Sequence, residues 1–198
     1  MNPITLFVAF VLLLTFREAP AQNTNTPGTR IVAAARQQIG VTTGYDPAYV
    51  QISYPGGDVP IQTGVCSDVV VRTLRKVGID LQKELHEDME KNFKAYPQNW
   101  RLSGPDKNID HRRVANLMRY FERHEIAITE KPARPESYAA GDIVAWDLGN
   151  NLLHIGIVSN RSDSGVPLVI HNIGNGACEE NILFKYKVIG HYRIRDAR

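Results

Sequence analysis

The fold is decided by residues 141–172, GDIVAWDLGNNLLHIGIVSNRSDSGVPLVIHN. Short runs rich in Val, Ile and aromatic residues alternate in this stretch with turns made of Gly, Asn, Asp and Ser. Such runs, bounded by turn residues, are typical of antiparallel strands. One more run of this kind follows near the C-terminus. We expect strands at residues 143–146, 152–158, 167–171 and 188–194.

The chain before this stretch has the periodicity of helices. Val114, Leu117, Met118 and Phe121 recur at the spacing of one helical face, and other segments repeat in the same way. We expect helices over 30–39, capped by Thr29, over 67–77, through 81–89, and after a cap at Asp110. Helices followed by strands predict an α+β fold, with a helical N-terminal half packed on one face of an antiparallel sheet.

The composition is that of an ordinary globular protein. The chain has 198 residues, of which 43% are hydrophobic and 22% charged, and a formal net charge of +2. Because this charge is small, no strong field favours nucleic acid as a partner. Two cysteines are too few for a disulfide-rich scaffold. The composition therefore argues against a nucleic-acid-binding protein and a disulfide-rich scaffold, but it does not indicate a function.

The N-terminus has the features of an export signal. Residues 4–16 are apolar except for two threonines, which is shorter than the ~20 residues that span a bilayer. Ala19-Pro20-Ala21 fits a small-x-small cleavage site. The sequence thus predicts a signal peptide at 1–21, a polar tether at 22–28 and one domain at 29–198, in a periplasmic or secreted protein. We expect no stable membrane insertion after cleavage; an uncleaved N-terminal anchor is the alternative.

Cys66 and two histidines are the strongest candidates for catalysis. Cys66 opens a predicted helix, and the positive end of a helix dipole stabilises a thiolate. A hairpin turning at residues 162–163 would make His154 and His171 direct cross-strand neighbours on one face, with Asn172 on the other. This places a base beside a group that orients it.

Other interpretations of these residues stay open. Cys66 could be a small buried hydrophobe, and each histidine could be structural. Cys66, His154 and His171 could instead bind zinc with one open position. Cys66 could also form a disulfide with Cys178, which would remove the nucleophile.

Five short motifs resemble a known family when they are taken in order. They are Tyr54-Pro55-Gly56-Gly57, Cys66-Ser67-Asp68, Gly141-Asp142-Ile143-Val144-Ala145-Trp146, His154-Ile155-Gly156-Ile157-Val158 and Val169-Ile170-His171. This order resembles the NlpC-type cell-wall peptidases, a papain-like group, over residues 30–194. The sequence around the histidines more closely resembles a bacterial domain-of-unknown-function family within that clan.

The resemblance implies a papain-like fold and a cysteine hydrolase that cuts peptide or amide bonds in peptidoglycan. Cys66 would be the nucleophile, His154 the base and His171 its orienting partner. Tyr54 would line the substrate groove, with Ser67 and Asp68 also in the substrate site. The implied partners are peptidoglycan stem peptides, bound by a monomer without a cofactor or a metal.

The sequence also departs from the family pattern. The family usually has an Asp directly before the cysteine, associated with a free amine of the stem peptide, and this chain has Val65 there. The helical stretch 81–125 is longer than in plain members. The scissile bond therefore stays open, and so does a non-catalytic envelope binding module on the same fold. Tyr45 and Tyr49 are further candidates for a groove wall.

Overall fold

The computed structural model describes residues 26–124, 126–128 and 134–195. Within them lie the helices α1 (Pro27–Arg36), α2 (Cys66–Lys76), α3 (Leu81–Asn92) and α4 (Val114–Arg123) and the strands β1 (Ile143–Asp147), β2 (Leu153–Asp163), β3 (Val166–His171), β4 (Cys178–Glu180) and β5 (Lys187–Tyr192). Short 3₁₀ helices lie at η1 (Phe93–Ala95), η2 (Asp110–Arg112) and η3 (Pro135–Ser137). The predicted α+β class, with helices first and an antiparallel sheet second, is confirmed.

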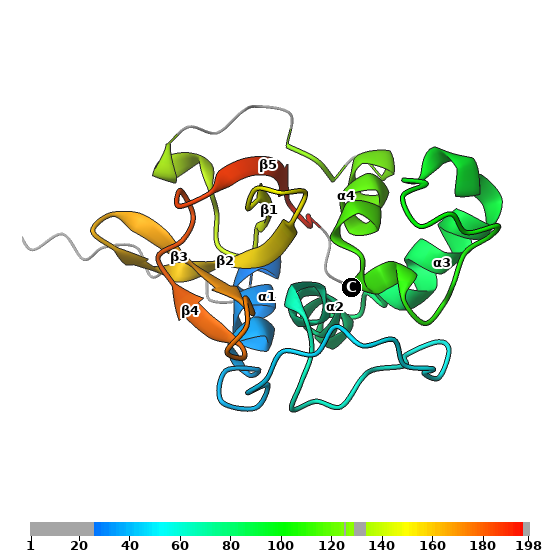
Figure 1. The fold of residues 1–198 in the computed structure, drawn as a ribbon. Helices are drawn as coiled ribbons and strands as arrows, with labels where there is room; N and C mark the ends of the chain where they lie inside the picture. Colours follow the sequence, from blue (N-terminus) through cyan, green and yellow to red (C-terminus); the bar gives the residue numbers. More distant parts are fainter. Residues whose placement is uncertain (1–25, 125, 129–133, 196–198) are drawn as a thin grey trace, which may run out of the picture.

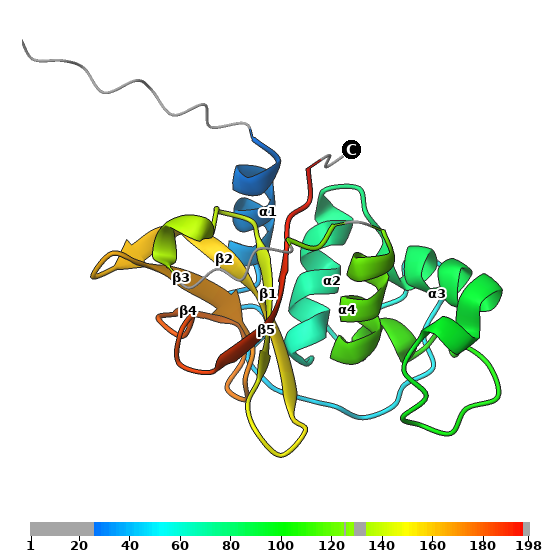
Figure 2. The same cartoon turned by 90° about the horizontal axis from the view of Figure 1, so that it is seen from above.

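The sheet has the strand order β4-β3-β2-β1-β5, and every neighbouring pair is antiparallel (Figure 1). Ile155 and Ile157 of β2 join the core shared with the helices, whereas Val158 joins a second core on the opposite face. Figure 2 shows α2, α4 and α3 on one side of the sheet, with α3 farthest from it. Residues 182–183 help to cover the other side.

Helix α2 is the buried centre of the molecule. Its first nine residues are all buried, and it contacts α1, α3 and strand β2. A helix that is buried all round must satisfy its polar side chains internally. Arg72 does so by pairing with Asp58 at 2.8 Å and by donating to the carbonyl of Thr63 at 3.0 Å. The start of this helix is consequently fixed from several sides.

Helix α1 begins earlier than predicted. Thr26 accepts a hydrogen bond from the backbone N–H of Thr29, and Pro27 occupies the first turn, where its missing N–H costs nothing. Residues 27–28 of the predicted tether are therefore helical, and the helix ends at Arg36 instead of residue 39. The predicted signal peptide 1–21 and residues 22–25 lie outside the described residues.

Two other elements differ from prediction. Strand β4 is not among the predicted strands, yet it pairs with β3 at the edge of the sheet. Asp110 does not cap an α-helix; it opens η2, and α4 begins four residues later at Val114. Its carboxylate instead accepts hydrogen bonds from the backbone of Asp106 and from Arg113.

The β2–β3 hairpin turns at Ser164-Gly165, not at residues 162–163. Both turn residues have positive φ, 50° and 81°, as a tight two-residue hairpin turn requires. The register then shifts between Val158 and Ser162, and Ile157 pairs with Ile170. The direct pairing of the two histidines is therefore wrong. His171 lies beside Gly156, where an added Cβ would come within 3.1 Å of the His171 Cβ.

The predicted register of β2 and β3 is wrong by two residues, and side chains along a strand alternate between the two faces with a period of two. His154 and His171 consequently remain on the same face, as diagonal neighbours instead of direct ones.

In the described part of the chain, no helix is long and apolar enough to cross a membrane.

Candidate active site

Cys66 is the first residue of α2, reached through Gly64 and the extended Val65. Gly64 has a φ of 152°, and a Cβ there would lie 3.1 Å from the Cβ of Asp68. The Asp68 carboxylate accepts the backbone N–H of Val65 at 2.7 Å. The N–H groups of Cys66 and Ser67 lie in the first turn, where no intrahelical carbonyl can accept them. They are available to a negative oxygen in front of the helix.

Ser67 and Asp68 support this helix start from inside the protein. Asp68 forms an ion pair with Arg112 at 2.9 Å, and Ser67 Oγ donates to the Arg112 carbonyl at 2.6 Å. Arg112 also donates to the carbonyls of Asp46 and Ala48. Ser67 and Asp68 were predicted to be substrate contacts, but the structure buries them in this network. They position Cys66, and their polar atoms face the protein.

The Cys66 thiol is not a thiolate at rest. Burial raises its pKa to about 11, although backbone hydrogen bonds from Ile155 and Ser67 act in the opposite direction. The prediction that the helix start would stabilise a resting thiolate is therefore wrong. A helix terminus contributes ~1 kcal/mol, which does not offset the removal of the charged form from water. The thiol needs a base.

His154 and His171 form a buried hydrogen-bonded pair, with His154 Nε2 3.0 Å from His171 Nδ1. Burial lowers the pKa of His154 to about 3 and also lowers that of His171, so both rings are neutral. Trp146, the cross-strand partner of His154, packs against its ring at 5.7 Å. In the tautomer in which His154 Nε2 is the donor of this bond, Nδ1 is the nitrogen left to accept a proton.

Strand β2 connects the thiol to this pair. Ile155 directly follows His154, and its backbone hydrogen-bonds to Cys66. The thiol therefore lies against β2 at the residue that follows the candidate base. The His154 ring itself packs on Trp146, which belongs to the core on the opposite face of the sheet, and neither histidine lines the pocket beside Cys66. Among the described residues, no hydrogen bond joins Cys66 to His154 itself. Catalytic hydrogen bonds often tighten only when substrate binds, so the ring would have to approach the thiol at that stage.

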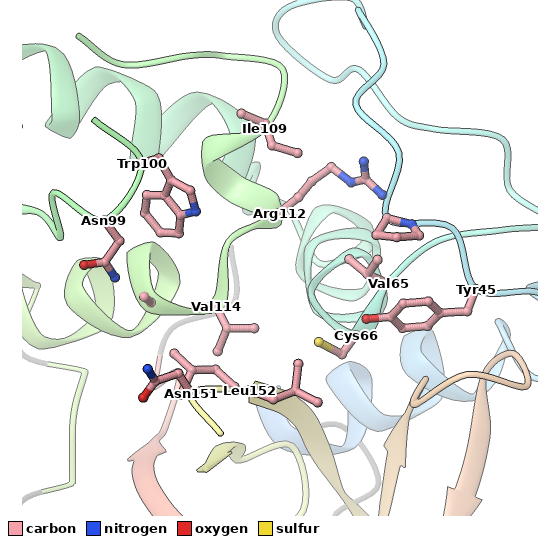
Figure 3. Close-up of a pocket in the computed structure, with 13 residues that line it drawn as sticks. Tyr45, Val65, Cys66, Asn99, Trp100, Ile109, Arg112, Val114, Asn151 and Leu152 are labelled. Atoms are coloured by element: carbon pink, nitrogen blue, oxygen red, sulfur yellow. The ribbon is translucent and has the colours of Figure 1, made fainter. Parts of the chain in front are cut away.

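A pocket of about 820 Å³ opens beside Cys66. Figure 3 shows the Cys66 sulfur at its wall, with Tyr45 beside it and Trp100 at the far end. Neither Asp nor Glu is among its lining residues, and its cation, Arg112, is already paired with Asp68. The aromatic and amide lining suits a neutral peptide segment better than a free amine.

The structure does not bring Tyr54 to this pocket. Its ring packs edge-on against His86 at 5.1 Å, and Lys107 lies 5.8 Å from its centre. Tyr45 lies near Cys66 instead, and its phenol has a raised pKa because of burial and of the nearby thiol. Trp100 is a pocket residue that sequence reasoning missed, because it lies in an irregular stretch with no periodicity.

Asn172 is a second residue whose role was missed. Its fully buried amide donates to the carbonyls of Gly44 and Gly64, each at 3.0 Å. Its oxygen accepts the N–H groups of Gly174 and Gly176. Asn172 thus ties the end of β3, directly after His171, to the loop that delivers Cys66. Its position next to His171 was the only signal in the sequence.

Comparison with known proteins assigns the family. A family model described as "Domain of unknown function (DUF1287)" matches residues 32–194. The chain belongs to the DUF1287 family. This confirms the predicted relationship to a domain-of-unknown-function family. The uncharacterized protein YijF of Escherichia coli (strain K12) is 59% identical over 164 residues, which are 82% of this chain and 80% of YijF.

A solved structure also resembles the chain. The structure of NlpC1 from Trichomonas vaginalis matches with a TM-score of 0.46 and 14% sequence identity. The match covers 91% of the DUF1287 chain and 48% of NlpC1, so the chain spans about half the length of that protein.

Two alternatives for the DUF1287 site can be compared with the geometry. Both cysteines are free, so the structure contains no Cys66–Cys178 disulfide. Among the described residues, Cys66, His154 and His171 are not a group that could surround one metal ion. The group that could do so is His171, Cys178 and Glu180. The zinc hydrolase built on Cys66 therefore lacks its ligand set.

Proposed function

We propose that this protein is an exported cysteine hydrolase that cleaves peptide or amide bonds in peptidoglycan. One observation carries the proposal. Cys66 starts a buried helix at the wall of a pocket, and its thiol contacts the backbone of Ile155, the residue after His154. His154 in turn bonds to His171. The motif order that resembles NlpC-type peptidases supports the same chemistry.

In the proposed mechanism, His154 acts as a general base through Nδ1. The mechanism requires the tautomer in which His154 Nε2–H donates to His171 Nδ1 across their 3.0 Å contact, which leaves His154 Nδ1 unprotonated. With pKa values of about 11 for the thiol and about 3 for the imidazole, a resting ion pair is strongly disfavoured. The proton therefore leaves Cys66 as the sulfur attacks the carbonyl carbon, and not before.

The start of α2 would stabilise the tetrahedral intermediate. Its oxyanion accepts the N–H groups of Cys66 and Ser67, which are fixed in place by the Asp68–Arg112 pair. His154 then returns its proton to the leaving nitrogen, and the C–N bond breaks. Water, deprotonated by His154, attacks the thioester and releases the free carboxylate and the thiol.

The substrate of this proposal is a stem peptide of peptidoglycan, acted on by a monomer outside the cytoplasm. The predicted export signal at 1–21 supports the location, and the pocket without acidic lining supports a substrate that carries no free amine near the scissile bond. N-terminal sequencing of protein recovered from the cell envelope tests export. We expect a chain that begins at Gln22; an intact Met1 on cytosolic protein contradicts it.

Digestion of purified peptidoglycan tests the activity. Wild-type protein should release fragments that mass spectrometry assigns to one bond. Cys66→Ala should release none, and the control Cys178→Ala, which changes the other free cysteine, should release the same fragments as wild type. Equal release by wild type and Cys66→Ala contradicts the proposal.

A non-catalytic binding module is the second candidate function. It is favoured by the protonated resting thiol and by the lack of a direct hydrogen bond from Cys66 to His154 in the described residues. Such a module would sediment with peptidoglycan equally well with and without the Cys66 side chain, and would release no fragment.

A further inference from the structure

The outer end of the histidine pair leads to a second cluster that the proposed chemistry does not use. Strand β4 pairs Cys178 directly opposite His171, and Glu180 follows two residues later on the same side of the strand. Cys178 Sγ lies 3.8 Å from His171 Nε2 and 3.3 Å from the Glu180 carboxylate. The contact to Cys178 is made by Glu180 Oε1, and the other carboxylate oxygen, Oε2, is 3.7 Å from His171 Nε2.

These separations match the edges of a tetrahedral metal site. Zinc binds Cys, His and carboxylate at ~2.0–2.3 Å, which places neighbouring ligand atoms about 3.3–3.6 Å apart. Each of the three contacts differs from this range by only a few tenths of an ångström, with Glu180 reaching Cys178 through Oε1 and His171 through Oε2. One ligand atom from each residue lies within 4.8 Å of the other two. His171, Cys178 and Glu180 also provide the nitrogen, sulfur and oxygen donors that zinc accepts, and a fourth position is left for water.

Strand β4 is held in place independently of this cluster. Glu179, whose side chain points to the other side of the strand, pairs with Arg36 at 2.7 Å and with Arg161 at 3.2 Å, and it also accepts a hydrogen bond from Ser159. Glu180 is exposed and Cys178 is partly so, which gives an ion access from solvent. His171, in contrast, is fully buried and already fixed through Nδ1.

The charges around Cys178 favour a cation between its sulfur and the Glu180 carboxylate. The Glu180 carboxylate lies 3.3 Å from Cys178 Sγ, so a thiolate at this position would lie directly beside a negative group. A divalent cation between the two groups reverses that repulsion and releases the thiol proton to solvent.

We propose that His171 Nε2, Cys178 Sγ and the Glu180 carboxylate form a Zn²⁺ site that inhibits the enzyme. Metal-ligating histidines hold a proton on the other ring nitrogen and donate it to a neighbour. Zn²⁺ on Nε2 therefore places the His171 proton on Nδ1, pointing at His154 Nε2. Neutral His154 must then carry its own proton on Nδ1, so it cannot accept the proton of Cys66.

Metal binding is tested without any substrate. Co²⁺ replaces Zn²⁺ as a probe, because a cobalt–thiolate bond gives a charge-transfer absorption. We expect this band in wild-type protein and in Cys66→Ala, its loss in Cys178→Ser, and its displacement by added Zn²⁺. Circular dichroism confirms that each variant is folded. No band in wild type, a band that survives Cys178→Ser, or one that is lost in Cys66→Ala overturns the site.

The inhibition rests on the proposed function, and a second experiment separates the two. Zn²⁺ should suppress peptidoglycan digestion by wild type at least tenfold, while Cys178→Ser should stay active and resist the same Zn²⁺ concentration. Equal inhibition of both proteins overturns the coupling through His171. If neither protein digests peptidoglycan but the cobalt band behaves as expected, the metal site stands and the hydrolase does not.

Discussion

The two free cysteines lie near different ends of the site, Cys66 against the residue that follows His154 and Cys178 against His171, and their surroundings differ. Cys66 contacts the β2 strand that carries His154, and backbone N–H groups surround its sulfur. Cys178 lies beside His171 and faces the Glu180 carboxylate. Burial raises the pKa of both thiols. A negative sulfur is thus stabilised by donors at the first end and opposed by an anion at the second, which suits a nucleophile at the first and a cation site at the second.

The two ends also differ in how firmly they are held. The ion pair behind Cys66 is buried, with only 3% and 4% of the Arg112 and Asp68 side chains exposed. At the other end, 51% of the Glu180 side chain is exposed. A catalytic oxyanion site needs fixed donors, whereas a site that takes up an ion from solvent needs an accessible ligand.

The largest expected difference between the surroundings of Cys66 and Cys178 is the effect on turnover of substituting the two histidines. His154→Ala removes the proton acceptor and should lower turnover by ~10²–10⁴-fold. His171→Gln should keep a measurable fraction, because an amide can still hold His154 Nε2. Turnover of peptidoglycan fragments by each purified variant is the measurement. If His171→Gln is as inactive as His154→Ala while His154→Gln remains active, the two roles are reversed.

Stability should separate the ends next. Asp68→Asn leaves the Arg112 guanidinium buried without its counter-charge, which costs ~3–5 kcal/mol of unfolding free energy. Glu180→Gln changes an exposed carboxylate and should stay within ~0.5 kcal/mol of wild type. Urea denaturation of both variants checks this. Equal losses would show that the Cys66 end is no more firmly held than the other.

Much of the fold could be predicted from local pattern. Strand β1 matched its continuous apolar run to within one residue, and α2, which has a strong helical periodicity, began one residue earlier than expected. Strand β4 was missed because its three residues, Cys178–Glu180, carry no apolar run, and only pairing with β3 makes them a strand.

The pairing of His154 with His171 was predictable from the sequence, whereas the surroundings of Cys66 were not. Strand alternation placed both histidines on one face in spite of a register error of two. The choice of Tyr45 over Tyr54 depends on how the loop 41–64 folds across the molecule, which no local signal contains. The raised pKa of Cys66 comes from burial by distant segments. The helix start alone predicted a lowered pKa, which is the wrong direction.

The smallest effect is a difference in alkylation between the two thiols. Because thiolate is the reactive form and both pKa values are raised, iodoacetamide labelling should still be rising from about pH 7 to about pH 10 at both sites. Relative to its own fully ionised rate, Cys66 should react faster than Cys178, since its pKa is raised less. Labelling at Cys66 that levels off below about pH 8 would mean that His154 already holds a thiolate, and the resting site described above would be wrong.

The most direct test of the central claim is to trap the acyl-enzyme. Protein mixed briefly with soluble peptidoglycan fragments and quenched in acid should carry a thioester adduct, and peptide mapping by mass spectrometry should locate it on Cys66. The adduct should be absent in Cys66→Ala and unchanged in Cys178→Ala. Fragment release with no adduct at Cys66, or an adduct on Cys178 instead, would contradict Cys66 as the nucleophile.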